Sequence, residues 1–146
     1  MIIDVNASIG RSLYSKALGL ADLLSEMKRL KITRAVVSPL LPPSFNFDQA
    51  NRQLAEIVSQ HPRKLIGLGR VDPRLGRKAL RYAHNAIEQY RLHGLKLHPW
   101  EEHYPINHPM VYPVMDYAQE ARVPVLIAGG YPTVSHALQI LELAQA

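Results

Sequence analysis

Short apolar runs alternate along this chain with stretches in which apolar residues recur every three or four positions. Residues 2–5 form the first run, the stretch 20–30 carries leucines and a methionine at helical spacing, and residues 35–37 form the next run. Short β-branched runs are typical of buried strands, and the three-to-four spacing is typical of an amphipathic helix. This segment therefore predicts one strand–helix–strand unit.

The same alternation continues to the end of the chain. A second helix, which Asp48 is expected to cap, carries apolar residues from Leu54 to Val58 and stops before Pro62. Pro109 is expected to open a later helix, because proline fits the first helical turn. In all, the pattern predicts five strands and five helices, with the remaining strands at 65–71, 94–98 and 123–127, a third helix around 80–90 and a last helix from about residue 133.

Strands that are apolar on both faces and always joined by helices are expected to be parallel. The sequence therefore predicts an α/β fold with a parallel βα repeat. Two architectures satisfy this pattern, an open doubly wound sheet and part of a (βα)₈ barrel, and the pattern alone does not choose between them. No long linker or low-complexity tract divides the chain, so residues 1–146 are expected to form a single domain.

The composition excludes several kinds of site and partner. The chain has no cysteine, so it offers no disulfide, no thiolate metal ligand and no cysteine nucleophile. It has no apolar run of the roughly 20 residues that cross a bilayer, and its first residues show no basic leader, so we expect a cytoplasmic protein without a membrane partner. The formal charge of +5 comes from scattered basic residues without interleaved aromatics, so nucleic acid is not an expected partner.

Functional side chains in either architecture lie just past the carboxyl ends of the strands. Lys96 and His98 alternate with leucines in the segment 94–98, which places both on one face of a strand. One interpretation makes Lys96 a cation for an acidic substrate and His98 a general acid or base. The alternative is a polar barrel centre without chemistry, in which His98 bonds a neighbouring loop and Lys96 offsets a buried carboxylate such as Asp4.

Three more residues at strand ends are candidates for substrate binding. Arg70 is placed to clamp a carboxylate with two hydrogen bonds, and Trp100 and Tyr131 are candidates for lining a ligand pocket. The alternative for the two aromatic residues is a packing role above the core. We expect Asp72 to cap the turn that begins at Pro73 rather than to orient Arg70.

Four short motifs follow one another at predicted strands, namely Met-Ile-Ile-Asp-Val at 1–5, Gly-Leu-Gly-Arg-Val-Asp-Pro at 67–73, Gly-Leu-Lys-Leu-His-Pro at 94–99 and Pro-Val-Leu-Ile at 124–127. In this order they resemble the amidohydrolase-2 type of metal-dependent hydrolase, over nearly the whole chain. The resemblance implies a (βα)₈ barrel that hydrolyses C–N or C–O bonds, or decarboxylates aromatic and vinylogous acids. It also implies a divalent metal that activates water or substrate.

This sequence departs from the family pattern at the metal-binding positions. The first strand of the family ends in His-x-His, whereas this chain has Asn6-Ala7-Ser8. The ligating histidine after the fifth strand corresponds to Ala128, and the metal-binding aspartate of the eighth strand falls beyond residue 146. Amide and hydroxyl oxygens are weak ligands for a transition metal, and a methyl group is none. We therefore expect a degenerate active site with no bound metal and no other cofactor.

The length raises a separate physical problem. Five βα units do not close an eight-stranded barrel, so the outer strand edges are expected to be open, as an incomplete TIM barrel. The chain could be a fragment of a longer protein, a homo-oligomer that pairs its open edges, or a compact open sheet. The helical pattern at 138–144 runs to the end of the chain without a C-terminal glycine, which favours a truncated barrel.

Three functional hypotheses follow from these observations. The first is an amidohydrolase-related domain with a degenerate metal site that binds a small acidic or carbonyl substrate. The second is an active hydrolase or decarboxylase that uses Lys96, His98 and Arg70 in place of the usual ligands. The third is a non-catalytic structural or assembly module.

Overall fold

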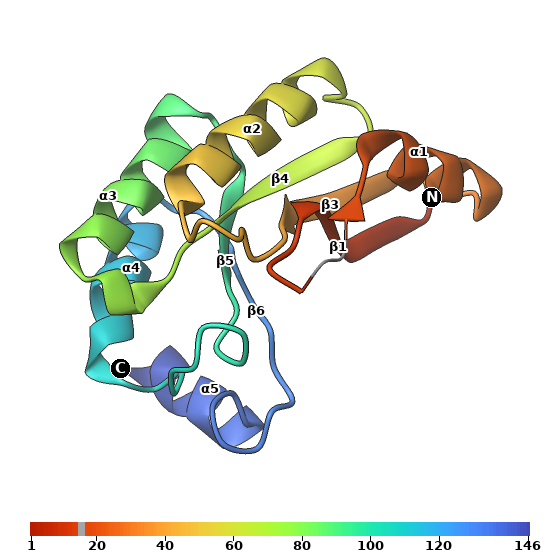
Figure 1. The fold of residues 1–146 in the computed structure, drawn as a ribbon. Helices are drawn as coiled ribbons and strands as arrows, with labels where there is room; N and C mark the ends of the chain where they lie inside the picture. Colours follow the sequence, from red (N-terminus) through yellow and green to blue (C-terminus); the bar gives the residue numbers. More distant parts are fainter. Residues whose placement is uncertain (15–16) are drawn as a thin grey trace.

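The computed structural model describes residues 1–14 and 17–146, and a mainly parallel β-sheet is its central feature (Figure 1). Six strands are hydrogen-bonded in the order β2-β1-β3-β4-β5-β6, and every pair is parallel except β1 with β2. The predicted parallel βα fold is therefore confirmed. The strands are β1 (Ile3–Arg11), β2 (Ala17–Leu18), β3 (Arg34–Pro39), β4 (Leu65–Arg70), β5 (Gly94–Leu97) and β6 (Val125–Ile127).

Helices connect the parallel strands, as the apolar spacing predicts. They are α1 (Leu20–Arg29), α2 (Phe47–Gln60), α3 (Arg77–His84), α4 (Tyr112–Glu120) and α5 (Ala137–Gln145). A five-residue π-helical turn, η2 (Asn85–Gln89), continues α3, and the 3₁₀ turns η1 (Pro73–Leu75) and η3 (Pro109–Val111) precede α3 and α4. Proline 109 thus opens a helical segment, although its first turn is 3₁₀ rather than α. None of the helices in the described part of the chain is long and apolar enough to cross a membrane.

Three local expectations were wrong. The antiparallel strand β2 was not predicted, because a two-residue strand leaves no periodicity in the sequence. Asn46, not Asp48, caps α2, since its Oδ1 accepts from the amide of Gln49 at 3.1 Å. The helix begins at Phe47, one residue before Asp48, and Phe47 is fully buried. The last helix begins at Ala137, because residues 131–135 form a turn of their own before it.

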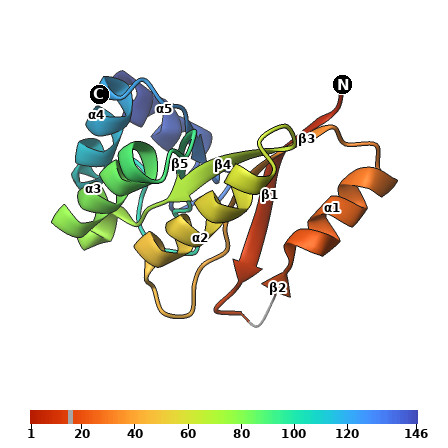
Figure 2. The same cartoon turned by 90° about the horizontal axis from the view of Figure 1, so that it is seen from above.

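One face of the sheet is covered by helices α1 to α4 (Figure 2). Ala35 and Val37 of β3 point into that layer and are fully buried, whereas Val36 between them is only partly buried. Gly67 and Gly69 let the helices approach β4 closely, since a Cβ at either position would lie 2.6 Å from a neighbouring side-chain carbon. A doubly wound sheet has helices on both of its faces. Helices on one face alone are therefore typical of a sector of a barrel.

The opposite face of the sheet corresponds to the interior of a barrel. Near the amino ends of the strands it is apolar, and Val5, Val36, Ile66 and Leu126 line a hollow there of about 240 Å³. Near the carboxyl ends it becomes polar. These strand ends carry the side chains that the sequence marks as candidates for chemistry.

Candidate functional site

A tier of polar side chains lies on this inner face, at the carboxyl ends of β3, β4 and β5 and in the middle of β1. The register pairs Ser8 with Ser38 and Arg70 with Lys96. The hydroxyl oxygens of the two serines are 3.4 Å apart. Asn6 joins this group from β1 through its contact with Lys96. We call these five residues the polar tier; strand pairing places them together although they are far apart in sequence.

Lys96 is the cation at the centre of the polar tier. Its side chain is buried, with the residue 4% exposed, and its Nζ donates a hydrogen bond to Asn6 Oδ1 at 2.5 Å. Among the ion pairs of residues 1–14 and 17–146, none includes Lys96. The proposed pairing with Asp4 is wrong, because the Asp4 carboxylate instead accepts from the amide of Asn6. The bulge in β1 between residues 4 and 7 turns Asn6 toward the lysine.

The environment of Lys96 disfavours its charged form. Burial lowers the pKa of the Lys96 ammonium, and the positive charge of Arg70 lowers this pKa further. The carboxylates of Glu101 and Glu102 act in the opposite direction without cancelling the effect.

Arg70 is buried as deeply as Lys96 but is surrounded by oxygen atoms. Its Nη2 donates to Glu101 Oε2 at 2.6 Å, and its Nε donates to Glu102 Oε1 at 2.7 Å. Its Nη1 lies 3.4 Å from the carbonyl oxygen of Pro39. The guanidinium therefore clamps carboxylates as its chemistry predicts, but they belong to the protein's own loop after β5.

The backbone of Arg70 is held by an asparagine that the sequence analysis missed. Asn51, fully buried on α2, accepts from the Arg70 amide at 2.8 Å and donates to its carbonyl oxygen at 2.9 Å. An asparagine among the apolar positions of an amphipathic helix was the available signal, because a buried amide needs polar partners. Likewise, two consecutive glutamates directly after a strand end were the signal for the partners of Arg70.

Glu102 is the least satisfied carboxylate of the site. It is 0% exposed, and its Oε2 has no hydrogen-bond partner among the described residues. Burial raises its pKa to about 7, although the Arg70 charge and hydrogen bond favour the ionised form. The hydroxyl of Tyr104 is also buried without a described partner, and burial raises its pKa above the ordinary value. Glu102 and Tyr104, in the loop after β5, thus each have a buried oxygen atom without a described hydrogen-bond partner.

Asp72 has the capping role predicted from its position before Pro73. Its Oδ1 accepts from the Arg74 amide at 3.0 Å, and its Oδ2 lies 2.8 Å from Arg74 Nη2. The side chain therefore begins the turn η1 and pairs with Arg74. None of the hydrogen bonds found for Asp72 in the described part of the chain reaches Arg70.

His98, Trp100 and Tyr131 lie together beside the polar tier. The Nδ1 of His98 accepts from the Glu101 amide at 3.3 Å, and its Nε2 lies 3.9 Å from Glu101 Oε2. Burial lowers the pKa of His98 below its ordinary value, and the charges of Arg70 and Lys96 add to this lowering while that of Glu101 opposes it. His98 is thereby favoured as a neutral imidazole, the form that accepts protons.

The two aromatic residues form a stacked pair. The ring centroids of Trp100 and Tyr131 are 5.1 Å apart with an interplanar angle of 5°, and the Tyr131 ring lies 6.3 Å from that of His98. Trp100 remains 49% exposed. The pair joins the loops after β5 and β6, so the five candidate residues, Arg70, Lys96, His98, Trp100 and Tyr131, converge on neighbouring strand ends. Whether they act on a substrate stays a prediction.

Asn6, Ser8 and Ala128, which the resemblance assigns to the family's metal-binding positions, do not form a donor set that suits a divalent transition metal. The Asn6 oxygen accepts from the Lys96 ammonium, Ser8 lies against Ser38, and Ala128 offers only a methyl group. Within the two described ranges, no three histidine, aspartate or glutamate side chains gather in a group that could hold a metal. A divalent metal at this place would also be repelled by the positive charge of Lys96.

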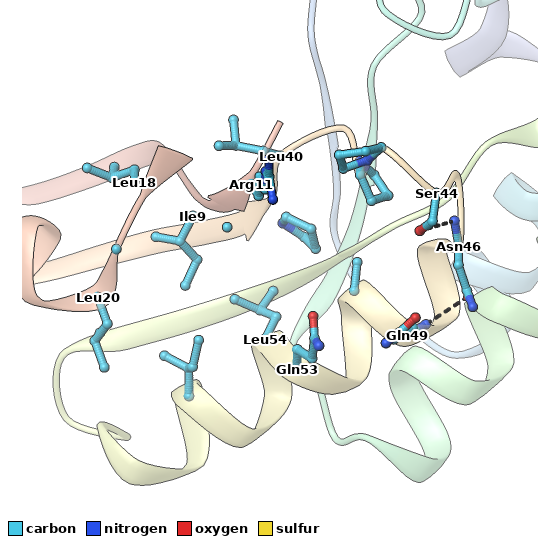
Figure 3. A pocket seen from close by; sticks show the side chains of 17 residues that line it. Ile9, Arg11, Leu18, Leu20, Leu40, Ser44, Asn46, Gln49, Gln53 and Leu54 are labelled. Atoms are coloured by element: carbon cyan, nitrogen blue, oxygen red, sulfur yellow. Dashed lines mark hydrogen bonds between the residues drawn. The ribbon is translucent and has the colours of Figure 1, made fainter. Parts of the chain in front are cut away.

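A separate hollow of about 320 Å³ lies on the helix-covered side of the sheet (Figure 3). Ile9, Leu18, Leu20 and Leu54 line it from β1, β2, α1 and α2, together with polar residues such as Gln49 (Figure 3). None of the five candidate residues lines this hollow. It therefore lies outside the polar tier.

Solved structures with a similar fold include several enzymes that act on carboxylic acids. 5-Carboxyvanillate decarboxylase from Sphingomonas paucimobilis matches with a TM-score of 0.72 and 16% identity, over 90% of this chain and 52% of its own. 4-Oxalomesaconate hydratase from Rhodopseudomonas palustris matches with a TM-score of 0.65 and 16% identity, over 87% of this chain and 52% of its own. 2,6-Dihydroxybenzoate decarboxylase from Rhizobium matches with a TM-score of 0.67 and 13% identity, over 90% and 51%.

At these identities the likeness shows the fold, and the chain spans about half the length of the solved structures it matches. No curated protein matches it by sequence. The family model described as amidohydrolase matches residues 10–146, which is nearly the whole chain. The motifs at the strand ends and the fold agree with that match. This chain therefore belongs to the amidohydrolase family.

Proposed function

We propose that this domain binds a small acidic or carbonyl compound at the polar tier without a transition metal, and that the Lys96 side chain takes the place of the metal. The observation that carries this proposal is a buried lysine whose only hydrogen-bond partner in the described part of the chain is the neutral Asn6 amide. The family's metal site is, in this proposal, degenerate.

Lys96 lacks a compensating negative charge among its described partners. A buried cation without a counter-charge is unfavourable, because its desolvation is not repaid by a paired anion. Arg70, beside it, already has two carboxylates, so it competes weakly for a further anion. A ligand carboxylate at Lys96 would supply the missing negative charge and would restore the pKa of the ammonium toward its ordinary value. The polar tier therefore favours an anionic ligand.

A second candidate is an active hydrolase or decarboxylase, and the position of His98 favours it. This residue follows Lys96 by two positions on the same face, and its environment favours the neutral imidazole. A general base next to a bound acid is the minimum for proton transfer. The second candidate requires turnover that survives a chelator and is lost in His98→Gln.

Thermal melts with oxalate test the binding proposal, because oxalate is a small dianion without a reactive ketone. We expect oxalate to raise the melting temperature of the wild-type protein in proportion to RT ln(1 + [L]/Kd). Lys96→Met should abolish this shift, and Lys96→Arg should keep part of it, since arginine retains the charge. Lys64→Met is the matched control, because Lys64 is an exposed lysine outside the site.

Two results would contradict the proposal. One is an oxalate shift of equal size in wild type and Lys96→Met. The other is stoichiometric zinc or manganese in the purified protein, measured by elemental analysis, together with a melting temperature that the metal raises.

A further inference from the structure

We propose that the Lys96 amine is a covalent attachment point that forms a Schiff base with small 2-oxo acids, at the junction of Asn6, Ser8, Ser38 and Lys96. This inference rests on the proposed function, because it uses the same polar tier. It goes further in making Lys96 a nucleophile rather than a fixed charge.

The amine of Lys96 is placed next to an exposed residue. Lys96 is buried, but its Nζ reaches across the inner face to Asn6, which is exposed. The reacting nitrogen therefore contacts the one exposed residue of the polar tier. A lysine is activated as a nucleophile by desolvation or by a neighbouring cation, and Lys96 is buried in register with Arg70.

The described partner of Lys96 Nζ is neutral. A carboxylate partner would stabilise the ammonium form and occupy the lone pair with a proton, yet the described ion pairs include none with Lys96. The Asn6 oxygen accepts only one N–H and carries no charge. Burial and the nearby Arg70 both lower the pKa of Lys96, so the neutral amine is more accessible than in an exposed lysine.

Ser8 and Ser38 offer hydroxyl donors for the acid group of a ligand. The hydroxyls of Ser8 and Ser38 are 3.4 Å apart on neighbouring strands, and their hydrogen bond to one another is the one found for either side chain among the described residues. Both hydroxyls can therefore turn to donate to a carboxylate. The two serines lie on β1 and β3, and the Lys96 amine extends from β5 to Asn6 on β1, two residues before Ser8. An acid with its carbonyl beside its carboxylate fits this arrangement of hydroxyl donors and amine. This places the ligand in the class of small 2-oxo acids.

The covalent step needs no oxidant, reductant or metal. The neutral Nζ attacks the carbonyl carbon, a C–N bond forms, and the carbonyl oxygen takes a proton to give a carbinolamine. The C–O bond then breaks, both amine protons leave with that oxygen as water, and the C=N bond remains. Protonation of the imine restores the positive charge beside the ligand carboxylate. His98, two residues away on the same face, is the neighbouring group able to exchange these protons.

Borohydride trapping with pyruvate tests the inference. Wild-type protein incubated with pyruvate and sodium borohydride should gain the mass of one reduced pyruvate adduct, and peptide mapping should place it on the peptide that contains Lys96. Without borohydride, or in Lys96→Arg, the adduct should be lost completely. Lys96→Arg keeps the charge and the bulk but forms no imine, and circular dichroism would confirm that it folds. Lys64→Arg, a matched exposed lysine, should trap as wild type does.

The outcomes separate this inference from the proposed function. Absence of an adduct, or an adduct spread equally over exposed lysines such as Lys64, would overturn the Schiff base. If oxalate still raised the melting temperature through Lys96, anion binding alone would stand. Loss of both the oxalate shift and the adduct in a folded protein would remove the proposed function together with the inference.

Discussion

Arg70 and Lys96 are two buried cations paired in register on neighbouring strands, and their surroundings differ in kind. The guanidinium contacts two carboxylates and a backbone carbonyl, and an asparagine holds its backbone on both sides. The ammonium contacts one neutral amide oxygen. Arg70 thus holds the loop after β5 against β4, whereas Lys96 has no described carboxylate partner. The same charge is compensated at one position and uncompensated at the next.

Removing Arg70 should have the largest effect on this contrast. Arg70→Met leaves the fully buried Glu102 without its cation, and breaking a buried pair by removing one partner costs roughly 3–5 kcal/mol. Urea unfolding should show this loss in the free energy of unfolding. Arg29→Met is the control, because its pair with Glu26 is exposed on α1 and should contribute little to stability. Equal effects of the two substitutions would refute the structural role of Arg70.

The pH dependence of stability sharpens the same comparison through Glu102. Its pKa is about 7 in the folded protein against 4.5 for the ordinary group, so between these pH values the folded state keeps a proton that the unfolded chain has lost. Stability from this group is therefore full below about pH 4.5 and declines as the pH rises to 7, by at most roughly 3.4 kcal/mol at 1.36 kcal/mol per pH unit.

Glu102→Gln should flatten that decline, because glutamine does not ionise. Melting temperatures from pH 4.5 to 7.5 would check this, with the wild-type curve subtracted. The lowered pKa of His98 gives an opposite slope, in which stability rises toward the ordinary histidine pKa, and it is common to both proteins. An unchanged pH profile in Glu102→Gln would show that Glu102 is ionised in the fold.

Asn51 should have a smaller but clear effect on the Arg70 side of the comparison. Asn51→Ala removes two hydrogen bonds to buried backbone groups of Arg70 and leaves both unpaired, which we expect to cost about 2–3 kcal/mol. Denaturant unfolding measures the loss. Hydrogen exchange at the Arg70 amide should become faster, while hydrogen exchange in helix α1 should keep its wild-type rate. A stability within about 0.5 kcal/mol of wild type would contradict this role.

Lys96 should give the smallest and opposite change in stability. Lys96→Met removes a buried cation that lacks a described carboxylate partner, so we expect the ligand-free protein to gain about 1 kcal/mol in the free energy of unfolding. Urea unfolding of wild type and variant at neutral pH checks the sign. A loss as large as that in Arg70→Met would show that Lys96 is a structural cation, and the contrast between the two residues would disappear.

Much of the fold follows from local regularities in the sequence. The alternation of strand and helix patterns depends on residues a few positions apart, so β3, β4 and β5 lie at or near their predicted ranges. The same local logic makes Asp72 a cap. The resemblance that assigns Asn6, Ser8 and Ala128 to the family's histidine positions likewise rests on the sequence alone.

Other features of this protein depend on contacts that no local pattern encodes. The contact between Lys96 and Asn6 joins residues 90 positions apart, and a bulge in β1 decides that Asn6 rather than Asp4 receives the lysine. Arg70 meets Glu101 and Glu102 only because the loop after β5 folds back over β4. The chain alone determined which charged groups exist and which strand each occupies. Tertiary packing decided which charges are paired, because pairing depends on distances across the sheet and on the water that burial excludes.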